Sequence, residues 1–155
     1  ELTMLTAKDI MTRNVITVTP DTTVERFANL LTEHKISGMP VLDEKSKLMG
    51  IVTENDLISR NKRLHIPTVV TIFDAIIFLE NPKKFEEEIK KMIGIKVVDI
   101  CTKKVITLKE ETPLIEIATI MSEKKIHLLP VMRGDELVGI VGKADLVKAL
   151  AEGVA

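Results

Sequence analysis

The sequence of 155 residues contains no tryptophan and no tyrosine, and it has only 4 phenylalanines and 1 cysteine. One cysteine cannot close a disulfide within the chain, and it cannot form a zinc cluster of several thiolates. With so few aromatic rings, isoleucine, valine and leucine must supply the core. The hydrophobic share of 45% is sufficient for such a core.

The chain also lacks an excess of charge of either sign and lacks a long hydrophobic run. Its net charge is −1, which gives no electrostatic footprint for nucleic acid or for an anionic membrane surface. No apolar stretch reaches the roughly 18 residues of a membrane-spanning helix, and the N-terminus shows no signal-peptide pattern. We therefore expect a cytoplasmic protein that binds neither nucleic acid nor membranes.

What the chain does contain is an internal repeat. The segment Asp9-Ile10-x-Thr12-x-x-Val15-Ile16-Thr17 returns about ninety positions later as Asp99-Ile100-x-Thr102-x-x-Val105-Ile106-Thr107. Near the end of each copy, Leu48-x-Gly50-Ile51-Val52-x-x-x-Asp56-Leu57 corresponds to Leu137-x-Gly139-Ile140-Val141-x-x-x-Asp145-Leu146. A repeat of about 55 residues is one supersecondary unit that would be marginally stable alone. We therefore expect two repeats that pack on each other around a pseudo-symmetric crevice.

Both copies predict the same order of elements: short helix, strand, helix, strand, strand, helix. Thr6-x-x-Asp9 predicts a capping box at the first helix, and the β-branched run from Val15 to Val18 predicts a strand. A helix with an apolar stripe and a hairpin of two strands follow in each copy. The last helices are expected to begin near Asn55 and Ala144. The predicted fold class is α/β, with repeats at residues 1–60 and 97–155.

Residues 61–96 form an insert that the repeat does not explain. A helical apolar stripe centred on Ile76 is followed by Asn81-Pro82 and then by a charged segment that ends at Gly94. This pattern predicts a helical hairpin. The hairpin either covers the sheets or provides a surface for a second copy or another partner.

Each repeat ends a predicted strand with Gly-Ile-Val and then turns into a helix that carries an aspartate, Asp56 in one copy and Asp145 in the other. Such a turn presents backbone N–H groups at the positive end of a helix dipole, where an anion can bind. The carboxylate is also suited to accept both hydroxyls of a ribose. Thr53-x-x-Asp56 equally fits a capping box, in which these residues would only stabilise the helix start.

The tandem repeats resemble a known family, the paired cystathionine beta-synthase (CBS) domains that are called Bateman modules. The resemblance rests on Gly-hydrophobic-hydrophobic-Thr-x-x-Asp and on the segments Ile36-Ser37-Gly38-Met39-Pro40-Val41 and Ile126-His127-Leu128-Leu129-Pro130-Val131. It covers nearly all of the chain outside the insert. It implies a regulatory module that binds AMP, ADP, ATP, S-adenosylmethionine or NAD between the repeats and signals to another protein.

In this family the aspartate and a preceding Thr or Ser hold the ribose, while the other repeat encloses the adenine. The resemblance implies one site made of Thr53, Asp56, Val105, Ile106, Ile126, His127 and Leu128. It implies a second site made of Asp145, Val15, Ile16, Ile36, Ser37 and Gly38. Gly142 stands where the second site should have a hydroxyl, and we expect this to weaken that site. His127 either packs on the surface or faces a ligand phosphate.

Two other functions remain open from the sequence. One is a structural dimerisation module without a ligand, which Gly142 favours. The other is an enzyme, which fits less well, because the sequence has no Gly-rich phosphate loop with Lys and Ser or Thr, no HExxH motif and no Cys-His pair with a third orienting residue. We therefore predict no catalytic residue, no catalytic cofactor and no metal site, and we expect a homodimer.

Overall fold

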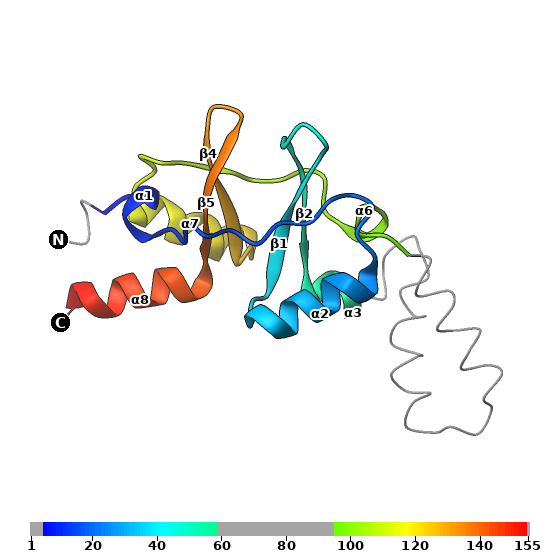
Figure 1. The fold of residues 1–155 in the computed structure, drawn as a ribbon. Coiled ribbons are helices and arrows are strands. Elements are labelled where there is room, and N and C mark those ends of the chain that lie inside the picture. Colours follow the sequence, from blue (N-terminus) through cyan, green and yellow to red (C-terminus); the bar gives the residue numbers. More distant parts are fainter. Residues whose placement is uncertain (1–4, 59–94, 155) are drawn as a thin grey trace, which may run out of the picture. The chain divides into compact units, whose positions relative to one another are not determined.

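The computed structural model describes residues 5–58 and 95–154 (Figure 1). Nearly all of the predicted insert, including its stripe around Ile76, lies outside these residues. The described elements include both helices and strands in each repeat, which confirms the α/β class. They are α1 (Ala7–Ile10), α2 (Val24–His34), β1 (Gly38–Leu42), β2 (Leu48–Thr53), α3 (Glu54–Ile58), α6 (Val97–Ile100), β3 (Leu108–Lys109), α7 (Leu114–Lys124), β4 (Leu128–Arg133), β5 (Glu136–Gly142) and α8 (Lys143–Val154).

The chain forms two compact units, and each combines parts of both repeats. Of the described residues, unit 1 contains 5–16, 46–48 and 104–154, so it holds α1 together with α7, α8 and the sheet β3-β4-β5. Unit 2 contains residues 17–45, 49–58 and 95–103, so it holds α6 together with α2, α3 and most of the sheet β1-β2. The short first helix of each repeat therefore lies in the unit built mainly from the other repeat.

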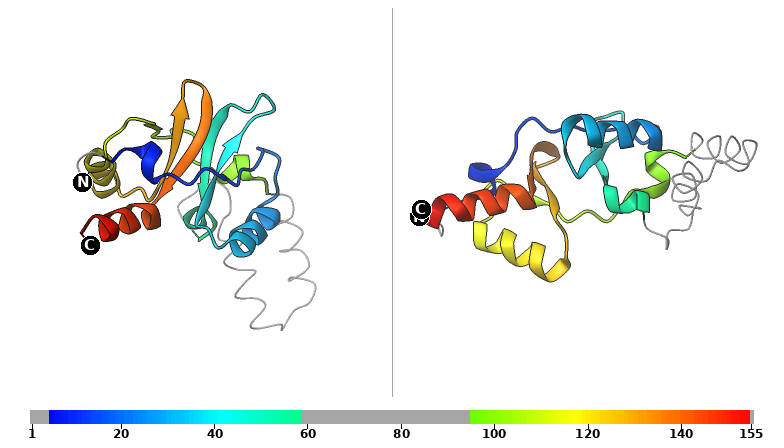
Figure 2. Two further views of the ribbon diagram at one scale, coloured as in Figure 1. Left: turned by 60° about the vertical axis from the view of Figure 1, so that its left-hand side comes forward. Right: turned by 90° about the horizontal axis from the view of Figure 1, so that it is seen from below.

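Backbone hydrogen bonds hold α1 in unit 1. The Ala7 N–H donates to the Thr112 carbonyl at 2.9 Å, and the Leu114 N–H donates to the Leu5 carbonyl at 2.9 Å. After α1, Thr12 and Ile140 of β5 exchange two backbone hydrogen bonds, of 2.8 and 3.0 Å. In Figures 1 and 2, α1 accordingly lies beside α8 and β5, with which it is in contact.

The same bonds recur in unit 2 at positions shifted by the repeat. The Val97 N–H of α6 donates to the Thr22 carbonyl at 2.8 Å, and the Val24 N–H donates to the Ile95 carbonyl at 3.0 Å. Thr102 and Ile51 of β2 exchange two bonds, both of 2.9 Å. The exchange of first helices is therefore a repeated feature of the fold.

The strand predicted from Val15 to Val18 is reduced to a single parallel bridge between Val18 and Val41. Here the Val18 N–H donates to the Pro40 carbonyl at 3.1 Å, and the Leu42 N–H donates to the Val18 carbonyl at 2.9 Å. One step further toward the N-terminus, the ladder would need an N–H at Pro40, which proline lacks. The strand prediction was wrong for residues 15–17 for this reason.

Proline has the same effect in the second repeat. There β3 pairs with β4 in parallel through Leu108 and Val131, and continuation toward the N-terminus would need an N–H at Pro130. Val105 and Ile106 therefore precede the strand and do not belong to it. The two predicted hairpins are confirmed, at β1-β2 and at β4-β5.

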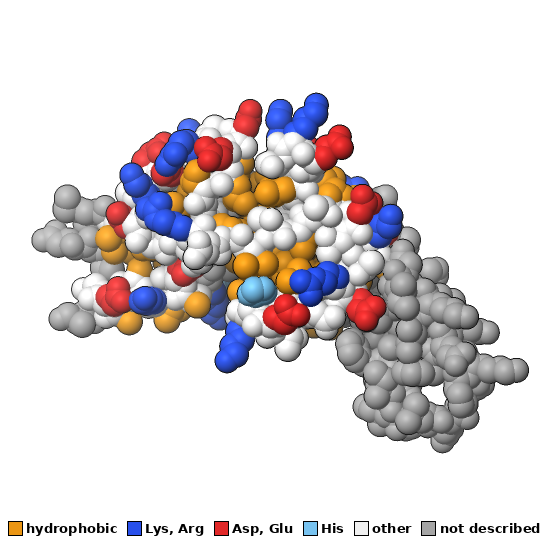
Figure 3. Space-filling view, in the orientation of Figure 1, with side chains coloured by type: hydrophobic (Ala, Val, Ile, Leu, Met, Phe, Trp, Pro, Cys, Tyr) orange, Lys and Arg blue, Asp and Glu red, His pale blue; other side chains and the backbone are white. Residues whose placement is uncertain are grey.

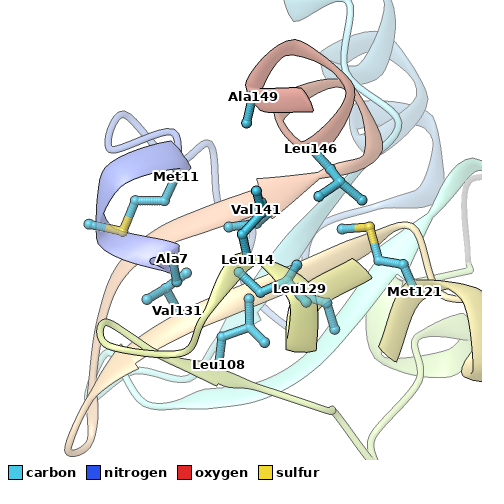
Figure 4. Close-up of a cluster of buried hydrophobic side chains, with 11 residues drawn as sticks. Ala7, Met11, Leu108, Leu114, Met121, Leu129, Val131, Val141, Leu146 and Ala149 are labelled. Carbon is cyan, nitrogen blue, oxygen red and sulfur yellow. The ribbon is translucent and has the colours of Figure 1, made fainter. Parts of the chain in front are cut away.

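The core of unit 1 is aliphatic, as the near absence of aromatic residues predicts. Figure 4 shows side chains from α1, the sheet, α7 and α8 converging on one cluster. The buried members are Ala7, Met11, Leu108, Leu114, Ile117, Met121, Leu129, Val131, Val141, Leu146 and Ala149. Full burial of an aliphatic side chain stabilises a fold by about 1.5–3 kcal/mol. The burial of Ala7 and Met11 in this cluster therefore contributes to holding α1 in unit 1.

Candidate nucleotide site

Asp56, at the start of α3, is the one polar or charged side chain that is buried among the described residues, with 6% of its surface exposed. Its Oδ2 accepts the Thr53 backbone N–H at 2.8 Å and lies 3.4 Å from the Thr53 hydroxyl. Thr53 is the last residue of β2, so the carboxylate lies across a tight strand-to-helix turn in unit 2.

Unit 1 contains the same turn without the hydroxyl. Asp145 Oδ2 accepts the backbone N–H of Gly142 at 2.8 Å, and Asp145 is half-buried. An added Cβ at Gly142 would meet nothing closer than the Leu128 Cδ1 at 3.6 Å, which is an ordinary van der Waals distance. A side chain at position 142 is therefore sterically acceptable, so packing does not require glycine there. Because the residue is glycine, the turn has no hydroxyl of its own.

The first residue of each last helix is hydrogen-bonded to the segment before the first strand of the preceding hairpin. In unit 2 the Glu54 N–H donates to the Ser37 carbonyl at 2.8 Å, and in unit 1 the Lys143 N–H donates to the His127 carbonyl at 3.0 Å. Ser37 and His127 are both exposed. Each aspartate turn thus lies next to the Pro-containing segment of its own repeat.

The capping interpretation is confirmed in part, because the carboxylate half of a capping box is present at Asp56. The same reach-back bond occurs at the exposed Asp9, which accepts the Thr6 N–H at 2.8 Å, and at the exposed Asp99, which accepts the Lys96 N–H at 3.0 Å. The Thr6 N–H and hydroxyl hold the pKa of the Asp9 carboxyl below its usual value. Capping therefore does not require burial, and burying a carboxylate is unfavourable.

Most of the remaining predicted residues lie outside the strands, while Gly38 and Leu128 are the first residues of β1 and β4. In unit 1, Val15 and Ile16 lie in the same unit as Asp145, together with Val105, Ile106, Ile126 and Leu128, and all six are half-buried. In unit 2, the half-buried Ile36 and the buried Gly38 flank Ser37, in the same unit as Thr53 and Asp56. Each of the two predicted sites draws residues from both units. Their assembly across the units stays a prediction.

One functional candidate was missed by sequence reasoning. The Thr12 hydroxyl, in the segment after α1, donates to Asp145 Oδ1 at 3.1 Å, although the two residues are 133 positions apart. The signal was present in the sequence, because Thr12 and Thr102 are part of the repeated Asp-Ile-x-Thr motif. No role followed from it, because the sequence does not show that α1 lies against the last turn of the other repeat.

Several other site classes find no support in the part of the chain that the structure describes. It contains no group of three or more His, Cys, Asp or Glu side chains placed to hold a metal ion. None of its helices is long and apolar enough to cross a membrane. Acidic and basic side chains lie intermixed over both units in the view of Figure 3, in keeping with a net charge near zero.

One protein family accounts for both repeats of this chain. The family model described as CBS domain matches residues 7–63 and again residues 97–152. The chain belongs to the CBS domain family. The resemblance stated from the sequence is thereby confirmed, and the fold is a tandem CBS module.

Related CBS proteins share both sequence and fold with this chain. An uncharacterized protein of Methanocaldococcus jannaschii is 31% identical over 92% of this chain and 89% of its own length. The CBS domain of a CBS domain containing membrane protein from Sphaerobacter thermophilus has a TM-score of 0.75, with 28% identity over 96% of this chain and 89% of that one. The structure of Arabidopsis thaliana CBSX2 in complex with AMP has a TM-score of 0.70, with 28% identity over 95% and 97%.

Some CBS relatives are much longer than this chain. The chain spans 57% of CBSX1 of Arabidopsis thaliana and 23% of an inosine-5'-monophosphate dehydrogenase of M. jannaschii. In the dehydrogenase the match covers only that minor part of the enzyme's length.

Proposed function

We propose that this chain is a regulatory module that binds an adenine nucleotide or a related adenosine compound and signals its presence to another protein. The observation that carries the proposal is the similarity to CBSX2, which has been solved in complex with AMP and shares the fold over 95% of this chain. The proposal is not enzymatic. The match to the dehydrogenase covers only 23% of that protein's length.

The chemistry of the two turns supports a ribose-binding role. Asp56 and Asp145 each accept the turn N–H through Oδ2, and an ionised carboxylate at such a turn is a strong acceptor for ribose hydroxyls. Hydrogen bonds to a charged group contribute about 1.5–3 kcal/mol each. In this proposal Thr53 assists Asp56, and the exposed His127 faces the ligand phosphate.

The proline-interrupted strands support a place for the adenine. Val15, Ile16, Val105 and Ile106 are half-buried and lie outside the β-ladders. A flat base needs apolar side chains to pack on and backbone groups that are not committed to a sheet. We propose that these segments, with Ile36 to Gly38 and Ile126 to Leu128, supply both.

The regulatory step would be a shift of population. A nucleotide that contacts residues from both units favours the arrangement in which its contacts are complete, by its difference in affinity between the arrangements. A partner protein that binds one arrangement then responds to the nucleotide. A ligand-free dimerisation module would lack this response.

We expect an adenosine ligand to raise the melting temperature, because it binds the folded chain and not the unfolded chain. At about 100 times its dissociation constant, one bound ligand adds about 2.7 kcal/mol to the free energy of unfolding. For a chain of this length the gain corresponds to roughly 5–10 °C. The measurement is a thermal-shift panel of AMP, ADP, ATP, S-adenosylmethionine and NAD, with inosine monophosphate as a control for the base.

A shift of less than one degree across the whole panel would contradict nucleotide binding and favour the structural dimerisation module. Release of phosphate from ATP under the same conditions would favour the enzyme.

We also propose a homodimer. Three large hydrophobic side chains are exposed on two neighbouring helices of unit 1, namely Ile115 on α7 and Val147 and Leu150 on α8, at 70%, 54% and 40%. Grouped exposed hydrophobic residues are a feature of interaction surfaces. Light scattering is expected to give twice the mass of one chain, and Val147→Asp is expected to lower it. A monomeric wild type would refute the dimer.

A further inference from the structure

The second aspartate turn receives a hydroxyl from an unexpected element. Asp145 Oδ2 is held by the Gly142 N–H at 2.8 Å, while Asp145 Oδ1 is held by the Thr12 hydroxyl at 3.1 Å. In unit 2 the residue before α3 is Thr53, and its own hydroxyl lies 3.4 Å from Asp56 Oδ2. Unit 1 has glycine at that place, and Thr12, in the segment after α1, supplies a hydroxyl to the Asp145 carboxylate.

Thr12 is firmly placed for this role. Its backbone forms two hydrogen bonds with Ile140 of β5, of 2.8 and 3.0 Å, and Gly142 lies two residues further along the same strand. Thr12 is exposed and Asp145 is half-buried, so this pair faces solvent and is open to a ligand. The preceding Met11 is buried, with 8% of its surface exposed, and its side chain packs against Gly139 of β5.

We propose that Thr12 is a positioning residue of the second nucleotide site, where its hydroxyl replaces the one that Gly142 lacks. This inference rests on the proposed function. The hydroxyl donates one hydrogen bond to the carboxylate and keeps its own oxygen as an acceptor, so it orients Asp145 and offers a further contact to a ribose hydroxyl. The second site is then competent in spite of Gly142, and the weakening expected from the sequence does not follow.

The test is calorimetric titration with AMP in an Asp56→Asn background, which leaves the second site as the main binding site. Thr12→Val keeps the shape of the side chain and removes the hydroxyl, and it is expected to lower the affinity for AMP about ten-fold or more. Thr12→Ser keeps the hydroxyl and should stay within about two-fold. Thr119→Val is the matched control, because the Thr119 hydroxyl bonds the Ile115 carbonyl at 2.8 Å within α7 of the same unit.

A hydroxyl introduced at position 142 tests whether Thr12 positions Asp145 or only supports the fold. Adding Gly142→Ser to Thr12→Val is expected to restore most of the affinity, because the Cβ at position 142 has room and the serine hydroxyl lies where Thr53 lies in unit 2. A variant that lost affinity through damage to the fold would not be rescued in this way.

The outcomes separate the inference from the proposed function. If Thr12→Val binds AMP as tightly as its parent while Asp145→Asn abolishes binding, the role of Thr12 is refuted and the module remains a nucleotide sensor. If the Asp56→Asn background binds no AMP but the wild type does, the second site is refuted and the first stands. If the wild type binds none of the adenosine compounds, both proposals fall together.

Discussion

Asp56→Asn is expected to weaken nucleotide binding at the first site, which contains Thr53 and Asp56, by about thirty- to a hundred-fold. The asparagine keeps one oxygen to accept the Thr53 N–H, which Asp56 Oδ2 accepts at 2.8 Å in the wild type. It replaces the ionised acceptor for ribose hydroxyls with an amide donor, so the hydrogen bonds to the ribose are lost or reversed. Calorimetric titration with the compound that gives the largest thermal shift measures the loss.

A pure capping role predicts a different result for the same variant. If Asp56 only capped α3, Asp56→Asn would leave the affinity unchanged and alter the free energy of unfolding by about 1 kcal/mol or less. Asp99→Asn is a matched control, because Asp99 in unit 2 accepts the Lys96 N–H at 3.0 Å in the same way but is exposed. Unchanged binding in both variants would return Thr53 and Asp56 to the helix cap.

Gly50→Ala and Gly139→Ala are each expected to destabilise the fold by about 1–3 kcal/mol. A Cβ at Gly50 would lie 2.9 Å from the Cys101 Sγ and 3.0 Å from the Thr102 carbonyl oxygen. A Cβ at Gly139 would overlap the Met11 Sδ and lie 2.8 Å from the Met11 Cγ. In both units the added methyl forces apart a strand and the segment that follows the exchanged helix. Urea unfolding of the two variants gives the loss.

Gly142→Ala serves as the control for these two variants, because it adds the same methyl three residues further along β5 with 3.6 Å of clearance. Its free energy of unfolding should stay within about 0.5 kcal/mol of the wild type. Equal stability of Gly139→Ala and Gly142→Ala would contradict the close packing of α1 on β5. It would thereby also count against the placement of Thr12 beside Asp145.

The sequence alone predicted the family, the α/β class and most of the elements. These features depend on local patterns that repeat, such as the apolar stripe of α2, where Val24 and Phe27 are buried, and the Gly-Ile-Val strand that ends at each aspartate turn. Local patterning of this kind is set by helix and strand periodicity, which is readable without contacts. The aspartates were found for the same reason, because each follows a strand at a fixed spacing.

The extent of the first strands depended on a partner that local sequence does not show. The run from Val15 to Val18 has a strong β-propensity, yet only Val18 is bridged to β1. The ladder ends because Pro40 offers no N–H at the next position, and this follows only when the register between the two segments is known. Strand length is thus a property of the pair and not of one segment.

The exchange of first helices was decided by tertiary structure. The motifs Asp9-Ile10 and Asp99-Ile100 are the same, so the sequence cannot tell which repeat each helix joins. The structure assigns them through long-range backbone bonds, such as that from Ala7 to Thr112. Because α1 joins unit 1, Thr12 meets Asp145 across 133 positions, a contact that comes from the path of the chain and that no local pattern encodes.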